Sequence, residues 1–181
     1  AFATFSTLIH KKILMKEHAL EFVTTLAIFN FLFTLPLLYK ADFGFPAKIW
    51  LILVIVSLIN SVGIIFLAKA FRHLEISVAS PLMGFEPGFV VLLAFLFLKE
   101  GISFLQMWGL VLALIGGYLL EVRKEKFSLL QPIREAIKSK YIHYGLFAIL
   151  LYSFSSIITR FIVNTDKGFG LNIYTYIIIV H

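Results

Sequence analysis

One acidic side chain lies within a long uncharged apolar run. Glu86 is the one charged residue between Ile76 and Leu98. If this run crosses a bilayer, a charged carboxylate near its centre costs about 2.5–3.5 kcal/mol unless it is protonated, paired or in contact with water, and such residues usually mark ion or substrate pathways. We therefore predict that Glu86 binds substrate or exchanges protons. The alternative is a carboxyl that hydrogen-bonds to a neighbouring helix and only fixes packing.

The residues around Glu86 interrupt a helix. Pro87 has no backbone N–H and cannot donate to the carbonyl of Met83, while Gly84 and Gly88 loosen the same turn. We therefore predict a kink or break at Gly84, Pro87 and Gly88, close to the middle of the run. Interrupted helices at that depth are typical of substrate sites in transporters.

Two other apolar runs carry polar side chains on one helical face. In the run that begins at Ile49, the polar residues are Ser57, Asn60 and Ser61, spaced i, i+3 and i+4. In the run that begins at Ile142, they are Tyr152, Ser155, Ser156 and Thr159. Each face is a candidate lining for a substrate cavity, with hydrogen bonding between helices as the alternative.

Small residues recur at every fourth position further along the chain. They are Gly109, Ala113 and Gly117. Such a face lets helix backbones approach closely, so we predict a role in helix packing.

The motifs of soluble enzymes are missing. The sequence has no GxGxxG, GxxxxGK[ST] or HExxH motif, and its five His residues are scattered without ligand spacing. It also contains no Cys, which excludes a disulfide framework, an iron–sulfur centre and a thiol nucleophile. We therefore expect no enzymatic activity, metal or cofactor. The net charge of +6 is confined to short breaks between apolar runs, so we expect no nucleic-acid partner.

Composition indicates that membrane helices position these residues. Hydrophobic residues make up 60% of the chain and charged residues 14%, against about 45–50% and 25% in soluble proteins. Because a span needs about 20 apolar residues, we predict five complete spans. These are Phe22–Tyr39, Ile49–Ala68, Ile76–Leu98, Ile102–Leu120 and Ile142–Thr159. The runs at Ala1–Ile9 and from Phe169 onward are interpreted as incomplete spans, which indicates a fragment.

The spans divide into two units. Residues 123–141 form a basic linker, either an amphipathic helix on the membrane surface or a solvated connection. The segment Phe5–Leu14 matches Phe154–Val163 at several positions, and a repeat of five spans places the second copy in the opposite orientation. We therefore predict an all-α polytopic bundle with a first five-helix repeat in residues 1–122 and the start of an inverted second repeat in residues 142–181. Lys and Arg concentrate on the linker side, which predicts that this side is cytoplasmic.

Several short motifs follow one another between Leu67 and Glu121. They are Ser77-Val78-Ala79-Ser80-Pro81-Leu82, Glu86-Pro87, Leu98-Lys99-Glu100-Gly101, and Gln106, Gly109 and Gly116-Gly117. In this order and spacing they resemble the EamA-like domain of the drug/metabolite transporter superfamily. The resemblance implies ten helices in two inverted repeats around a central cavity. It also implies transport of small metabolites, amino acids or drugs without ATP, and a cytoplasmic N-terminus, opposite to the orientation that the charges predict.

Together these observations favour an integral membrane secondary transporter, an exporter or permease that works by alternating access. We expect it in a prokaryotic plasma membrane, with a small-molecule substrate and, through Glu86, protons as partners. The alternatives are a non-transporting receptor or scaffold, and a flippase of lipid-linked substrates. The sequence does not determine the oligomeric state, and a homodimer is one option.

Overall fold

The computed structural model describes residues 12–14, 18–74, 79, 82–99, 101, 103–121, 138–164 and 168–180. Within these ranges the chain forms helices and connecting loops and no strand. The helices are α2 (Ala19–Thr34), the 3-10 helix η1 (Leu35–Lys40), α3 (Ala47–His73), α5 (Glu86–Leu98), α6 (Phe104–Glu121), α8 (Lys140–Val163) and α9 (Ile173–Val180). The predicted all-α class is confirmed for this part of the chain.

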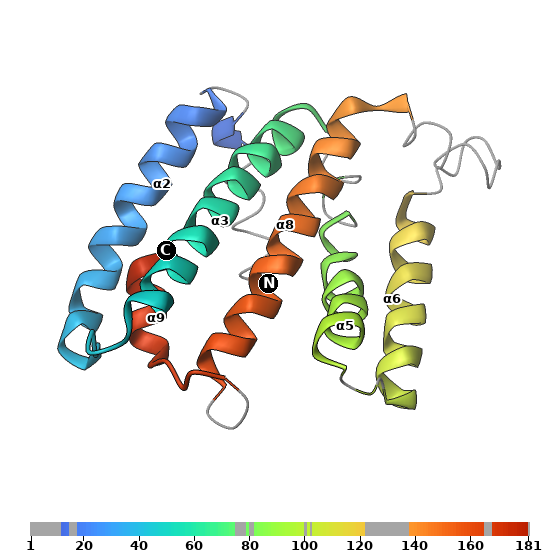
Figure 1. The fold of residues 1–181 in the computed structure, drawn as a ribbon. Coiled ribbons are helices and arrows are strands. Elements are labelled where there is room, and N and C mark those ends of the chain that lie inside the picture. Colours follow the sequence, from blue (N-terminus) through green and yellow to red (C-terminus); the bar gives the residue numbers. More distant parts are fainter. Residues whose placement is uncertain are drawn as a thin grey trace.

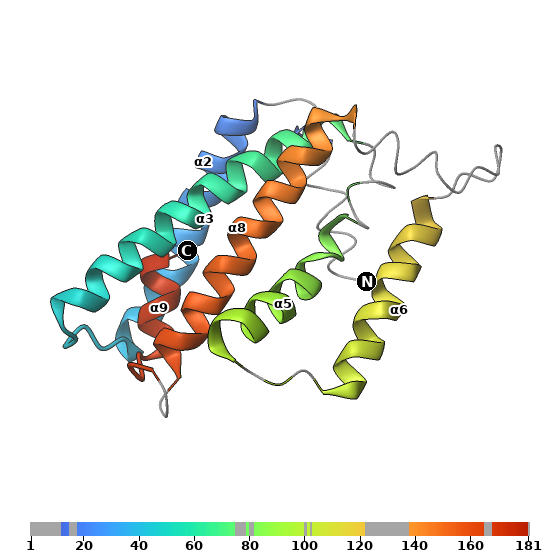
Figure 2. The ribbon, with the colours of Figure 1, turned by 45° about the vertical axis from the view of Figure 1, so that its right-hand side comes forward.

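The long helices stand side by side rather than in chain order. Figure 1 shows α2, α3, α8, α5 and α6 following one another across the molecule, with α9 beside the lower halves of α2 and α3. The view in Figure 2 shows α5 and α6 on the far side of α8 from α2. Thus α8, which belongs to the last part of the chain, lies between α3 and α5.

Among the residues that the structure describes, three helices are long and apolar enough to cross a membrane. They are Ala19–Lys40, which joins α2 and η1, then Ala47–His73 and Lys140–Val163. They contain the predicted spans Phe22–Tyr39, Ile49–Ala68 and Ile142–Thr159. This agrees with a protein that crosses the membrane several times.

The other predicted spans differ from the structure or lie partly outside the described residues. In place of one helix over Ile76–Leu98, the described part has a turn at Gly84 and Phe85, and α5 is a shorter apolar helix that begins only at Glu86. The helix α6 covers most of Ile102–Leu120. The predicted span Ala1–Ile9 and most of the linker lie outside the described residues. The two-unit division and the inverted repeat stay predictions.

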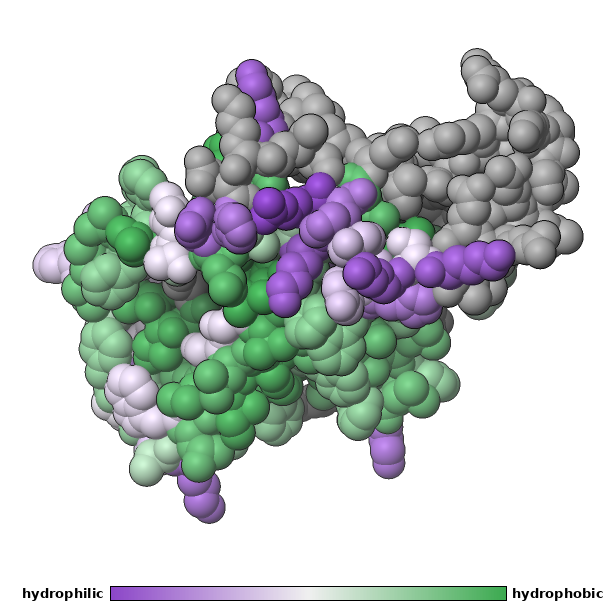
Figure 3. All heavy atoms as spheres, turned by 90° about the horizontal axis from the view of Figure 1, so that it is seen from above, coloured by the Kyte–Doolittle hydropathy of each residue, from purple (hydrophilic) through white to green (hydrophobic). Residues whose placement is uncertain are grey.

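Large apolar side chains cover the outer surface. Phe33 of α2 is 78% exposed and Leu105 of α6 is 82% exposed. In water, so much exposed apolar area would mark an interaction surface, whereas in a bilayer it is the surface that meets lipid tails. Figure 3 looks onto the end where α3 finishes and α8 begins, and shows hydrophilic side chains gathered there beside apolar ones. Apolar sides and a hydrophilic end are the pattern of a membrane protein.

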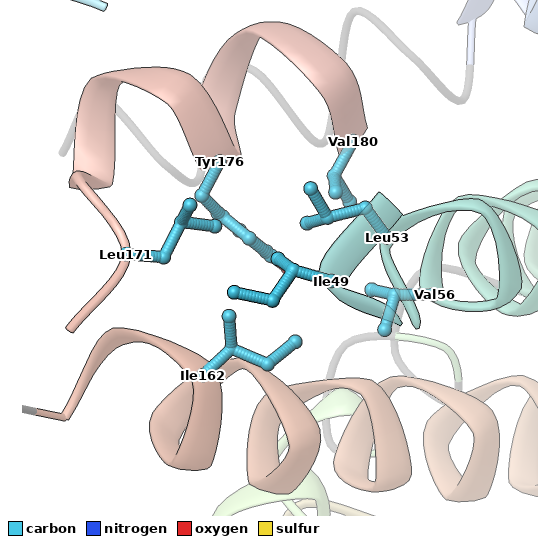
Figure 4. Close-up of a cluster of buried hydrophobic side chains, with 7 residues drawn as sticks. All are labelled: Ile49, Leu53, Val56, Ile162, Leu171, Tyr176 and Val180. Atoms are coloured by element: carbon cyan, nitrogen blue, oxygen red, sulfur yellow. The ribbon is translucent and has the colours of Figure 1, made fainter. Parts of the chain in front are cut away.

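Two apolar clusters hold α8 against α3 at the two ends of this pair. One contains Ala70, Leu74, Ala79, Leu82 and Ile149. The other brings the start of α3 and the end of α8 together with α9, and is drawn in Figure 4. Its buried members are Ile49, Leu53, Val56, Ile162, Leu171, Tyr176 and Val180. Between the two clusters the helices leave space for a cavity.

Candidate functional site

A cavity of about 810 Å³ lies among five helices. This volume is in the range of pockets that hold metabolite- or drug-sized ligands. The polar residues that line it are Asn30 of α2, Asn60 and Ser61 of α3, Glu86 of α5, Tyr152, Ser155, Ser156, Thr159 and Arg160 of α8, Asn164 after α8, and Tyr176 of α9. Apolar side chains such as Val23, Ile64 and Val163 complete the wall. Polar groups thus converge inside a bundle whose outer surface is apolar.

Glu86 lines this cavity from the first residue of α5. Phe85 is the N-cap of α5, and its carbonyl accepts the bond from the Phe89 N–H at 3.2 Å. The carboxylate therefore sits in the first turn, where the helix dipole favours negative charge. Pro87 lies in the same turn, where a missing N–H breaks no helical hydrogen bond. Within the described part of the chain, Glu86 is half-buried and its carboxylate makes no hydrogen bond or ion pair.

The glycines around Glu86 have separate roles. Gly84 belongs to the turn that precedes α5. Gly88 is buried, and a Cβ added there would lie 2.8 Å from Leu110 Cδ1 of α6. Gly88 therefore leaves room for the Leu110 side chain of α6 against α5, in addition to its place beside the predicted break.

The polar face of α8 lines the cavity along two turns. Thr159 Oγ1 donates to the Ser155 carbonyl at 2.7 Å and lies 2.6 Å from the Tyr176 hydroxyl. Since the Thr159 proton is used on the carbonyl, Tyr176 donates to Thr159. This bond ties α9 to α8 at the cavity wall. Tyr152 and Ser156 make no side-chain hydrogen bond within the described residues, so their hydroxyls are available to a solute.

The polar residues of α3 have two different neighbours, the cavity and α9. Asn60 and Ser61 line the cavity, and Ser61 Oγ donates to the Ser57 carbonyl at 2.8 Å. Ser57 itself is not among the lining residues, because its hydroxyl donates to the Ile179 carbonyl of α9 at 3.1 Å. The structure thus brings together six of the seven residues predicted to bind or couple, and places Ser57 in a helix contact.

The predicted packing face of α6 meets no neighbour where it is described. A Cβ added at Gly109 would find no other atom within 4 Å. The side chains at 113 and 117 lie outside those that the structure describes. Packing by Gly109, Ala113 and Gly117 stays a prediction.

Four polar lining residues were not predicted: Asn30, Arg160, Asn164 and Tyr176. Asn30 had a usable signal, since it is an amide inside the apolar run of α2. Arg160 and Asn164 lie near the end of the apolar run of α8, where polar residues are ordinary in a membrane helix. No sequence signal pointed to Tyr176, because this residue reaches the cavity wall only through the packing of α9. Arg160 also takes part in a further interaction.

Backbone and side-chain bonds tie α9 to the loop before α3. The Asp42 N–H donates to Thr175 Oγ1 at 2.9 Å, and that hydroxyl donates to the Asp42 carbonyl at 2.7 Å. Asn172 Nδ2 donates to the Lys40 carbonyl at 3.0 Å, and the Lys40 ammonium lies 5.3 Å from the Tyr174 ring centre. These contacts hold α9, one wall of the cavity, to residues 40–42.

No group of three His, Asp or Glu side chains among the described residues could hold a metal.

Comparison with known proteins places the chain in one family. Neither a curated protein nor a solved structure matches the chain. The model of the EamA-like transporter family matches residues 1–122, about two thirds of the chain. This family is one of membrane transporters rather than enzymes, and membership implies a small-molecule substrate. The chain therefore belongs to the EamA-like transporter family.

Proposed function

We propose that this chain forms the substrate pathway of a secondary transporter, and that the cavity is where the solute binds during alternating access. The proposed cargo is a small metabolite, amino acid or drug. The observation that carries the proposal is a metabolite-sized cavity at the start of an interrupted helix, lined by six helix-borne polar residues that the sequence singles out. Interrupted helices whose N-terminal turns face a cavity are the usual substrate and ion sites of such proteins.

Glu86 is proposed to bind the solute or a coupling proton. Its carboxylate makes no hydrogen bond or ion pair with a described residue, so a bound cation, a proton or water can stabilise it there. The same carboxylate makes no hydrogen bond that would fix it to a described neighbour. This favours the functional interpretation over the packing one.

The test is solute flux in proteoliposomes made with the intact protein. A panel of labelled amino acids and amine drugs is followed with and without an imposed pH gradient. Glu86→Gln is expected to abolish the pH-dependent part of the flux, because glutamine keeps the size of the side chain but cannot ionise. The matched control is Glu21→Gln, since Glu21 is exposed on α2 and glutamine can still accept from the His18 N–H.

Two results would contradict the proposal. Unchanged pH-dependent flux in the Glu86→Gln protein would remove Glu86 from coupling. Binding of a solute without flux in the native protein would favour a receptor or scaffold instead.

A further inference from the structure

We propose that Tyr152, resting on the backbone of Gly63, sets the upper size of the solute that the cavity admits. The inference rests on the transport cavity proposed above and adds a determinant of its specificity. It concerns a contact between α3 and α8 rather than the charge of Glu86.

The ring of Tyr152 lies directly on a glycine of the neighbouring helix. A Cβ added at Gly63 would lie 3.2 Å from Tyr152 Cε1, 3.4 Å from Cζ and 3.6 Å from Cδ1. Three consecutive ring atoms at such similar distances place this Cβ over the face of the ring, so the ring face packs against Gly63. Gly63 is buried, and any larger residue there would occupy space that the ring now fills.

The ring separates Gly63 from the cavity. Tyr152 lines the cavity, whereas Gly63 does not. No hydrogen bond or aromatic contact of Tyr152 falls within the described residues, so packing fixes the position of the ring. Because the ring lines the cavity, a side chain added at Gly63 is expected to push the ring away from α3 and toward the cavity.

The size of this movement can be graded. An alanine Cβ at 3.2 Å requires the ring to give by a few tenths of an ångström. A valine adds two methyl groups and requires more. In a tight pocket, one methylene changes discrimination by about tenfold or more. Substitution at Gly63 should therefore exclude large solutes first.

These 181 residues contain no Cys, which allows a direct test once any Cys elsewhere in the intact protein is replaced by Ser. The reporter is Ser156→Cys, because Ser156 lines the cavity one helical turn after Tyr152. The intact protein in liposomes is alkylated with N-ethylmaleimide, which is small, and with N-(1-pyrenyl)maleimide, which is bulky. The measured quantity is the ratio of the bulky to the small reaction rate at this cysteine. A second reporter, Ser103→Cys, lies in the exposed loop before α6 and calibrates reagent reactivity.

The expected ratios follow from the position of the ring. Tyr152→Ala should raise the ratio by about tenfold, since it removes the obstacle. Gly63→Ala should lower it and Gly63→Val should lower it further. Tyr152→Phe should leave it unchanged, because the ring remains. Gly109→Ala is the matched glycine control and should also leave it unchanged, since a Cβ there meets nothing within 4 Å.

The outcomes separate this inference from the transport proposal. If the cysteine at 156 reacts but its ratio is the same in Tyr152→Ala and Gly63→Val, the size limit is not set by Tyr152 and this inference is overturned while the cavity stands. If that cysteine reacts with neither reagent in any variant, the cavity does not admit solutes and both proposals fail. Because Tyr152→Ala and Gly63→Ala predict opposite shifts, a general loss of folding cannot imitate the expected pattern.

Discussion

Thr175 is fully buried and uses its hydroxyl twice on the backbone of Asp42. Burying a hydroxyl without partners is costly, so its place in an apolar helix depends on this pair of bonds. The donor and acceptor of Asp42 lie in a loop, where no helical partner would otherwise satisfy them. One side chain thus satisfies three polar groups at the end of the bundle.

Replacing Thr175 by valine should lower the stability of the protein in detergent by about 1–3 kcal/mol, because the isosteric methyl leaves the Asp42 N–H and carbonyl without partners. The measurement is thermal unfolding of the purified protein. Thr24→Val is the matched control: Thr24 is exposed and its hydroxyl bonds only to the Leu20 carbonyl one turn earlier. Equal stability losses in the two variants would show that the bonds to Asp42 do not matter.

Individual polar residues were predictable where they broke an apolar pattern in a recognisable way. Glu86 is a charge in an uncharged run, and Tyr152, Ser155 and Ser156 repeat at helical spacing. Ser57 belongs to the same polar helical face as Asn60, yet its hydroxyl bonds to α9. The partner of such a side chain depends on which helix packs beside it. Periodicity identifies a polar face but not its neighbour.

At the scale of elements, α8 approaches its neighbours through small residues. Gly145 and Ala148 are buried, and Gly145 faces α3 and the segment before α5. A Cβ added at Gly145 would overlap the Leu82 side chain and lie 3.6 Å from the Ala70 Cβ. Small residues of this kind let membrane helices pack by close backbone contact.

Gly145→Leu should therefore destabilise the protein by about 1–3 kcal/mol through overpacking against Leu82 and Ala70. Thermal unfolding measures the effect. Gly116→Leu on α6 serves as control, because Gly116 is exposed and a Cβ there meets nothing within 4 Å. A control variant that unfolds as readily as Gly145→Leu would mean that the loss reflects leucine itself and not the contact.

Hydropathy predicted the three long helices well, because length and apolar content suffice to define a span. It failed to place the start of α5, where Gly84 and Phe85 form a turn before Glu86. The sequence indicated an interruption near Pro87. A proline can either occupy the first turn of a helix or kink a helix interior, so the sequence did not show which of the two occurs. The insertion of α8 between α3 and α5 was also out of reach, since no local pattern encodes contacts between distant segments.

At the scale of the whole molecule, hydrogen bonds hold one wall of the cavity to a neighbouring segment of the chain. The bonds between Asp42 and Thr175, and between Asn172 and Lys40, hold α9 to the loop before α3. Alternating access requires one part of a transporter to rock against another around a fixed site. If solute leaves at this end, these contacts must separate in each cycle.

A disulfide between Asp42→Cys and Thr175→Cys tests this requirement, since these 181 residues contain no other Cys and any Cys elsewhere in the protein can be replaced by Ser. The backbone of Asp42 already bonds to the Thr175 side chain, so the two positions are adjacent. Under the proposed mechanism, oxidation should arrest solute flux in proteoliposomes and a reductant should restore it. The single variants, treated with the same oxidant, should keep the flux that they have when reduced. A complete disulfide with unchanged flux would show that this end stays closed throughout, and the solute would then have to leave the cavity at another place.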